Sequence, residues 1–225
     1  MDKKIVLVVA PHADDESLGC GGTLLRHLDQ GDEVHWLLVT GMSIGSGFSE
    51  AQINQRKQEI AKVTGMYGFS AVHELKLPPA ALDTLPKGDV VVAISSVIKQ
   101  VQPQVVYTVY RNDAHSDHEV VFDAVMSATK SFRYPCVERI LSYETISETD
   151  FGMKPEDGGF RPNVYFNISK FLERKLDILD VFSSEMGDFP FPRSRKALEA
   201  LASLRGVQSS CDAAEAFMLL KEIND

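Results

Sequence analysis

Short apolar runs alternate with amphipathic segments along the first two thirds of the chain. The runs Ile5–Ala10, Glu33–Thr40, His73–Leu77, Val105–Tyr110 and Arg139–Glu144 are rich in β-branched residues and predict strands. Helical spacing predicts helices at about 19–30, 50–64, 90–101 and 118–130. Because the strands are almost continuously apolar, we expect helices on both faces of a mostly parallel central sheet, an α/β fold of three layers.

The pattern changes after the fifth predicted strand. Residues 145–163 are polar and contain several Gly and Pro, which predicts a surface loop. Val164–Ile168 predicts an edge strand, and Phe171–Phe182 and Arg195–Leu204 predict helices. The closing run AAEAFMLLKEI fits a helix or a strand. No linker divides the chain, so we expect one domain over residues 1–225, with the part from about 150 completing the substrate side.

Composition narrows the functional class. The chain has 32 acidic and 23 basic residues and a net charge of −9, which argues against nucleic-acid binding. Cys20, Cys136 and Cys211 match neither a disulfide framework nor a zinc ribbon, so we expect reduced thiols in a cytoplasmic protein. No apolar stretch approaches the ~20 residues of a membrane span, and the N-terminal apolar run is too short for a signal peptide. An exposed edge strand would permit homo-oligomers.

Two acidic, histidine-containing loops follow predicted strands. PHADDE begins at Pro11, after the first strand, and NDAHSDHE begins at Asn112, after VVYTVY. Either loop alone is also typical of a capped helix start. In a parallel sheet, however, both would lie at the carboxyl edge, where ligands bind. His12, Asp15 and a histidine of the second loop then form a His/His/carboxylate set, which is typical of catalytic zinc.

A glycine cluster offers an alternative interpretation. Gly19, Gly21 and Gly22 lie near the first strand, as in nucleotide- or S-adenosylmethionine-binding transferases. Eight residues separate them from the strand, and their spacing departs from G-x-G-x-x-G. We therefore expect these glycines to let the first helix pack closely on the sheet and to leave room for a ligand. His27, His35 and His73 are expected to be ordinary core or surface residues.

The chain resembles the PIG-L/LmbE-like zinc-dependent N-acetylglucosaminyl de-N-acetylases. PHADDESLGCGGTL is similar to their P-H-x-D-D-E-x-L-G-x-G-G-T signature, and AHSDH is similar to their H-x-D-H motif. Ala13 replaces a proline that many members have. Further similarity runs through RKQEIAKVTG, LKLPPAALD, RPNVYFNIS and AEAF, so the resemblance covers nearly the whole chain.

The resemblance implies a Rossmann-like hydrolase that removes acetyl from an N-acetylglucosamine unit. It assigns His12, Asp15 and His118 to the zinc ion and makes Asp14 the general base. His115 would steady or protonate the tetrahedral intermediate, and Arg56 would face the sugar. Ferrous iron also accepts such a ligand set.

Physical chemistry adds one role and leaves several features open. Asp117 is expected to orient His115 and to keep that imidazole charged. Arg193 and Arg195 would meet a substrate phosphate or, more simply, solvate a helix start. The loops at 41–48 and 149–159 would shape the sugar pocket, and Phe48, Tyr110 or Phe189 would stack on a sugar or simply pack. A catalytically silent sugar-binding relative is the remaining alternative, and the sequence does not identify the N-acetylated substrate.

Overall fold

The computed structural model describes residues 3–154, 156 and 158–224, and its centre is one seven-stranded sheet. The strand order is β3-β2-β1-β4-β5-β7-β6. The first five strands are parallel, whereas β7 is antiparallel to both β5 and β6. The bounds are β1 (Ile5–Ala10), β2 (Glu33–Thr40), β3 (Ala71–Leu77), β4 (Val105–Val109), β5 (Arg139–Tyr143), β6 (Val164–Asn167) and β7 (Ala214–Glu222).

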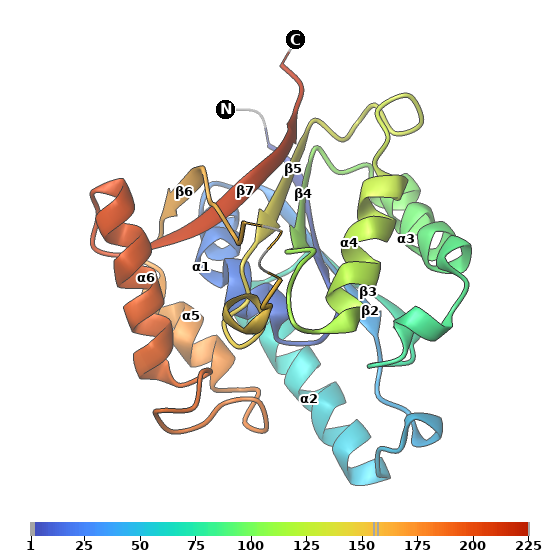
Figure 1. Cartoon of the computed structure of the whole chain (residues 1–225), viewed down its shortest axis with the longest axis horizontal. Coiled ribbons are helices and arrows are strands. Elements are labelled where there is room, and N and C mark those ends of the chain that lie inside the picture. Colours follow the sequence, from blue (N-terminus) through green and yellow to red (C-terminus); the bar gives the residue numbers. More distant parts are fainter. Residues whose placement is uncertain (1–2, 155, 157, 225) are drawn as a thin grey trace.

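Helices cover both faces of the sheet (Figure 1). On one face lie α1 (Asp15–Asp29), α2 (Glu50–Tyr67), α5 (Leu172–Leu179) and α6 (Arg195–Ser209), and on the other lie α3 (Lys87–Val101) and α4 (Ser116–Ala128). Short 3₁₀ helices lie in the loops after β2, β3 and β5, namely η1 (Ile44–Ser46), η2 (Leu82–Thr84) and η3 (Thr149–Phe151). The predicted three-layer α/β fold is confirmed, as is the edge strand β6.

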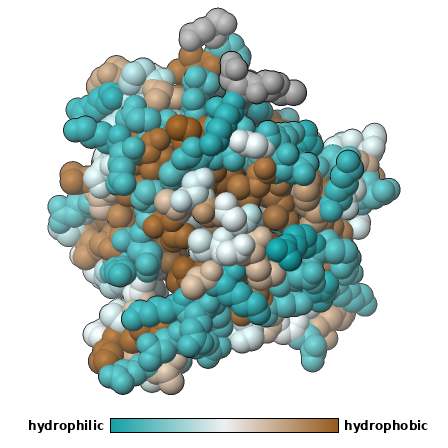
Figure 2. All heavy atoms as spheres, turned by 180° about the vertical axis from the view of Figure 1, so that it is seen from behind, coloured by the Kyte–Doolittle hydropathy of each residue, from teal (hydrophilic) through white to brown (hydrophobic). Residues whose placement is uncertain are grey.

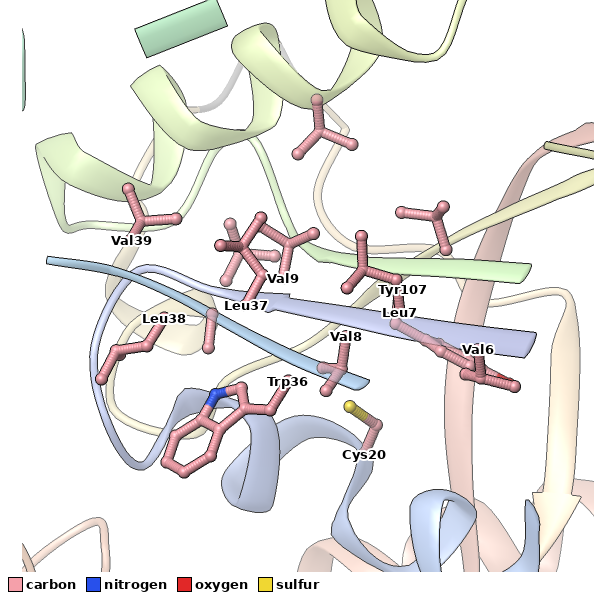
Figure 3. Close-up of a cluster of buried hydrophobic side chains, with 14 of the residues drawn as sticks. Val6, Leu7, Val8, Val9, Cys20, Trp36, Leu37, Leu38, Val39 and Tyr107 are labelled. Atoms are coloured by element: carbon pink, nitrogen blue, oxygen red, sulfur yellow. The ribbon is translucent and has the colours of Figure 1, made fainter. Parts of the chain in front are cut away.

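The core is built from the alternating side chains of the central strands. Val8 of β1 and Trp36 of β2 point toward α1, whereas Val9 and Val39 point toward α3 and α4 (Figure 3). All four are fully buried. Because helices cover both faces of the sheet, the central strands are continuous apolar runs in the sequence.

The first helix begins earlier than the sequence predicted. It starts at Asp15 rather than at about residue 19, and the Asp14 carbonyl already accepts the N–H groups of Ser17 and Leu18 at 2.9 and 2.8 Å. Acidic residues in the first turn favour this start because they interact well with the helix dipole. Near the predicted start there is instead a kink, where Cys20 has non-helical φ and ψ of −137° and 17°.

A buried ion pair satisfies the backbone groups that the kink releases. Glu215 of β7 accepts the N–H groups of Gly22 and Thr23 at 2.9 and 2.7 Å. Lys175 of α5 donates to the Leu18 carbonyl at 2.8 Å and to Glu215 at 2.7 Å. The final segment, which fitted a helix or a strand in the sequence, is therefore the strand β7. Its buried Glu215 accepts the backbone N–H groups that the kink in α1 leaves without partners.

Hydrophilic residues cover most of the lower part of the molecule in Figure 2, the end at which α2 lies. The three cysteines are unpaired. Within the described residues, no helix combines the length and the apolarity needed to cross a bilayer.

Candidate active site

The candidate site lies where the strand order reverses. Strands β2 and β3 lie to one side of β1, and β4 and β5 lie to the other. The loops that leave β1 and β4 therefore diverge at the carboxyl edge and open a crevice between them, the usual ligand position in such sheets. PHADDE leaves β1, and NDAHSDHE leaves β4, so the predicted meeting of the two acidic loops is confirmed.

Three of the predicted ligands converge in this crevice. One ligand atom each from His12, Asp15 and His118 lies within 4.8 Å of the other two. Asp15 Oδ2 is 3.2 Å from His12 Nδ1 and 3.3 Å from His118 Nε2. Asp15 and His118 are buried, and His12 is partly buried beside the cavity.

Each histidine of this group has a carboxylate on its other ring nitrogen. His118 Nδ1 lies 2.7 Å from Asp113 Oδ2, and His12 Nε2 lies 3.1 Å from Asp117 Oδ2. Asp117 is itself fixed by the N–H groups of Ala80 and Leu82 at 2.7 and 3.1 Å. Such carboxylate–histidine pairs fix the ring orientation and the tautomer of metal-binding histidines.

The donor set fits a divalent cation. With its Nδ1–H given to Asp113, neutral His118 turns the lone pair of Nε2 toward Asp15, and this buried Nε2 makes no hydrogen bond with any described residue. Burial lowers the pKa of His118, but Asp15 and Asp113 outweigh it and raise that pKa well above its ordinary value. The position between these groups thus calls for positive charge, and two imidazoles with one carboxylate suit zinc or ferrous iron.

The predicted link between Asp117 and His115 is wrong in its chemistry. The carboxylate of Asp117 binds His12, and only its backbone N–H meets His115, donating to Nδ1 at 3.1 Å. Burial, together with His12 and His118, lowers the pKa of His115, so the imidazole is not kept charged. Since Nδ1 accepts a hydrogen bond, the proton of the neutral ring lies on Nε2.

Asp14 lies beside the ligand group in an unusual environment. It is buried, lines the cavity and is 3.5 Å from Arg193 Nη1. Burial and the neighbouring carboxylates of Asp15 and Glu185 raise the pKa of Asp14 to about 7, against the opposing effect of Arg193. A carboxyl group that titrates near neutrality is suited to general acid–base chemistry.

Arg56 borders the cavity but directs its guanidinium into the protein. Nη1 donates to the Ala13 carbonyl at 2.7 Å, and Nε lies 3.0 Å from a carboxylate oxygen of Glu59. Nη2 bonds to Ser184 and forms a short ion pair with Glu185. The expected contact of Arg56 with the sugar stays a prediction, and its visible role is to position the backbone beside Asp14.

A cavity of about 670 Å³ opens above these residues. Phe48 and the beginning of the 41–48 loop line it, together with Arg193 and Glu185 from the segment between α5 and α6. Arg193 therefore belongs to the cavity rather than merely solvating a helix start, whereas Arg195 forms exposed ion pairs on α6. Tyr110 and Phe189 lie outside the cavity lining.

Two important residues were not singled out from the sequence. Asp113 stands in the second acidic loop, and the need of a ligand histidine for a carboxylate partner was a usable signal. Glu185 comes from a segment without periodicity and carried no comparable signal, whereas Arg193 was singled out, but as a contact for a substrate phosphate and not as a partner of Asp14. The loop at 149–159, whose residues 155 and 157 lie outside the described part, contributes Thr149, which donates to Asp113 at 2.7 Å.

The glycine cluster does not form a ligand site. A Cβ on Gly19 would lie 2.1 Å from a Tyr143 ring atom, and one on Gly22 would lie 2.8 Å from Ile168. These glycines are buried against protein, so close packing of the helix is confirmed, but no room for a ligand is left beside them. The structure thus removes the observation on which the nucleotide-binding alternative depended.

Comparison with known proteins finds relatives that are named as deacetylases. A probable N-acetyl-alpha-D-glucosaminyl L-malate deacetylase 2 from Bacillus cereus is 29% identical over 189 residues, 80% of this chain and 83% of that protein. The N,N'-diacetylchitobiose deacetylase from Pyrococcus horikoshii has a similar structure, with a TM-score of 0.79 at 21% identity over 98% of this chain and 85% of that one.

A second similar structure belongs to an enzyme with a different reaction. The 4-carboxy-2-hydroxymuconate hydratase from Pseudomonas putida has a TM-score of 0.74 at 18% identity over 99% of this chain and 98% of that one. The fold alone therefore does not decide the chemistry. Residues 7–129, which include both acidic loops, match the PIG-L family, described as GlcNAc-PI de-N-acetylase. Because this match spans more than half of the sequence, the chain belongs to the PIG-L family.

Proposed function

We propose that this protein is a metal-dependent hydrolase that removes the N-acetyl group from an N-acetylglucosamine-containing small molecule or glycoconjugate precursor. The observation that carries the proposal is the buried Nε2 of His118, which has no hydrogen-bond partner among the described residues and faces Asp15. His12, Asp15 and His118 would hold the metal, with zinc as the first choice and ferrous iron as the second. When bound, such a metal polarises a carbonyl and lowers the pKa of water to ~7.

Asp14 is the proposed general base. Its position beside Asp15, at the cavity wall, allows it to accept a proton from the attacking water and later to deliver it to the leaving amine. Both steps need a pKa close to the working pH, and the pKa of about 7 meets this need. Arg193 and Glu185 would hold the Asp14 side chain in position, so the part of the chain after about residue 150 would complete the site.

His115 is proposed to stabilise the oxyanion as a neutral donor. Its Nδ1 is already an acceptor for the Asp117 N–H, so Nε2–H is free to donate toward the acetyl oxygen. A preorganised donor of this kind contributes roughly 3–4 kcal/mol to transition-state stabilisation. Since the lowered pKa of His115 keeps the ring neutral, the donor needs no extra proton from solvent.

The substrate class follows from the relatives and from the cavity. Relatives are named as deacetylases of N-acetylglucosaminyl malate and of diacetylchitobiose. A cavity of about 670 Å³ lies within the range of ~300–1,000 Å³ that is usual for small-molecule sites. We therefore propose an amino-sugar conjugate as the substrate of this chain and, because its cysteines are unpaired, a location in the cytoplasm.

The test is acetate release from N-acetylglucosaminyl malate, diacetylchitobiose and simple N-acetylglucosaminides. Metal-stripped protein should be inactive, and added zinc should restore activity. Asp14→Asn should keep the metal and lose at least ~10²-fold in kcat, whereas His12→Ala should lose the metal as well. Asp29→Asn, an exposed change at the far end of α1, is the matched control. Full activity after metal removal, or in Asp14→Asn, would refute the mechanism, and metal-loaded protein that binds sugars without releasing acetate would indicate a silent relative.

A further inference from the structure

One carboxylate on the cavity wall has no role in the proposed chemistry. Glu148 comes directly before η3, is partly buried, and lines the cavity together with His115 and His118. We propose that Glu148 is a substrate-binding residue, which accepts a hydrogen bond from the sugar hydroxyl beside the acetamido group, the 3-hydroxyl. This inference rests on the proposed function, because it assigns a further substrate contact to the same site.

The backbone at Glu148 is attached to the second acidic loop. Its carbonyl accepts the N–H group of Ala114, the residue before His115, at 3.0 Å. The next residue, Thr149, donates its hydroxyl to Asp113 at 2.7 Å. The loop that carries a candidate ligand therefore also sets the position of Glu148.

A hydrogen-bonded turn holds the segment that contains Glu148. The carbonyl of Thr145 accepts the N–H groups of Glu148 and Thr149 at 3.0 and 2.9 Å, and Thr149 Oγ1 accepts the N–H group of Thr145 at 2.8 Å. Ser147, inside this turn, has a φ of +80°, a left-handed value that is unfavourable for residues other than glycine. Strained positions of this kind are concentrated at ligand-binding sites. The turn therefore presents Glu148 at the cavity wall in a preorganised position.

The carboxylate of Glu148 has no cationic partner. Asp14 and Glu185, which also line the cavity, both contact Arg193. In the part of the chain that the structure describes, Glu148 forms no ion pair. Its side chain accepts one long hydrogen bond, at 3.4 Å, from Ser147 Oγ. A partly buried carboxylate with so few partners can accept further hydrogen bonds, and a ligand in the cavity can donate them.

The location of the carboxyl group identifies the group that it would bind. Burial raises the pKa of Glu148, and the charges of His118 and Asp15 also act on it, so the carboxyl group lies near the candidate ligands. A sugar whose acetamide is held at these ligands brings its two neighbouring ring substituents to the same region. The glycosidic oxygen on one side has no hydrogen to donate. The 3-hydroxyl on the other side is a donor, and hydrogen bonds to an ionised acceptor are the stronger kind.

The experiment combines variants of Glu148 with substrates that lack one hydroxyl. Methyl N-acetylglucosaminide is compared with its 3-deoxy and 6-deoxy analogues on the zinc-loaded protein. Binding is measured by calorimetry, and acetate release is measured as kcat and KM. The variants are Glu148→Ala and Glu148→Gln, and thermal unfolding shows whether each is folded. Glu199→Gln, an exposed change on α6, is the matched control.

We expect Glu148→Ala to weaken binding of the parent compound and to raise its KM about tenfold, with kcat changed by less than about twofold. Glu148→Gln should have a smaller effect, about threefold, because its amide oxygen still accepts a hydrogen bond but carries no charge. The wild type should bind the 3-deoxy compound about tenfold more weakly than the parent, whereas Glu148→Ala should bind the two equally. The 6-deoxy compound should lose the same factor in every protein, and the control should behave as the wild type.

Two results would overturn the contact. The same ratio between the parent and 3-deoxy affinities in the wild type and in Glu148→Ala would mean that the two groups do not meet. A fall in kcat with an unchanged KM would mean that Glu148 acts on the reaction and not on binding. Either result with acetate still released would leave the proposed function standing. The expected loss of the 3-hydroxyl preference without any acetate release would support the contact and overturn the proposed function.

Discussion

The carboxylate of Asp113, on the far side of the His118 ring, provides a quantitative test of the proposed metal centre. His118 is fully buried, and its ring is held by one hydrogen bond, 2.7 Å long, to Asp113. Asp113 is in turn held by Thr149 Oγ1 at 2.7 Å. Asp113→Asn keeps an acceptor for the ring but removes the negative charge, whereas Asp113→Ala removes both. Loss of such an outer-shell partner typically weakens metal affinity or activity by 10–100-fold.

The structure therefore predicts a graded series. Asp113→Asn should weaken zinc binding by roughly tenfold and Asp113→Ala by roughly a hundredfold, about 1.4 and 2.7 kcal/mol of binding free energy. Thr149→Val should have a smaller effect than either, because Asp113 keeps its charge and its bond to His118. The assay is competition for zinc against a chelator of known affinity, with thermal unfolding of each metal-free variant to show that the fold persists.

Three results would refute this reasoning. Unchanged zinc affinity in a folded Asp113→Ala variant would mean that the orientation of His118 does not depend on Asp113. An equal loss in the matched control Asp29→Asn, an exposed residue at the end of α1, would mean that the effect is not local. A loss in Thr149→Val larger than that in Asp113→Asn would assign the positioning role to the loop at 149–159 instead.

Three further predictions concern stability. Gly19→Ala should destabilise the protein by at least ~1–3 kcal/mol in urea unfolding, because its Cβ would collide with the Tyr143 ring. Gly65→Ala, where a Cβ meets open space in α2, should instead stabilise the protein by up to ~1 kcal/mol. Similar free energies of unfolding in the two variants would contradict the packing argument. Glu215→Gln should cost ~3–5 kcal/mol by leaving Lys175 buried without a carboxylate, and a loss below 1 kcal/mol would contradict this. Burial lowers the pKa of His27, so the unfolded state binds a proton at this residue more readily than the folded state. The free energy of unfolding should therefore fall as the pH drops through 6.5. His27→Gln should make the plot of this free energy against pH flatter, and equal slopes in the two proteins would exclude the effect.

The two candidate ligand loops could be predicted from the sequence because each loop is one short contiguous segment. PHADDE is a contiguous segment after an apolar strand, and its position at the carboxyl edge follows from the parallel topology alone. The helix start at Asp15 was missed because a metal-type motif and an acidic first turn use the same residues. The final strand was ambiguous because a short apolar run has no decisive period, and only the contacts of Glu215 with α1 show why it must be a strand.

The sequence could not predict which side chains pair with each other when they come from distant segments. The sequence paired Asp117 with His115, its neighbour in the same loop, and only the fold places its carboxylate on His12 at 3.1 Å. Arg193 and Arg195 are two residues apart in one polar segment. One lies in the cavity and the other on an exposed helix face, a distinction that depends on how the chain returns from α5.

The candidate metal ligands and the residues that surround Asp14 come from different parts of the chain, so membership of the family does not by itself decide the substrate. The matched residues 7–129 carry the three candidate ligands and Asp14. The position and charge environment of Asp14, however, depend on Arg193 and Glu185, which lie outside that range and are bound to Asp14 and Arg56. Changes in the segment between α5 and α6 can thus alter the base without touching the metal ligands. Specificity within the family should therefore follow this segment rather than the two acidic motifs.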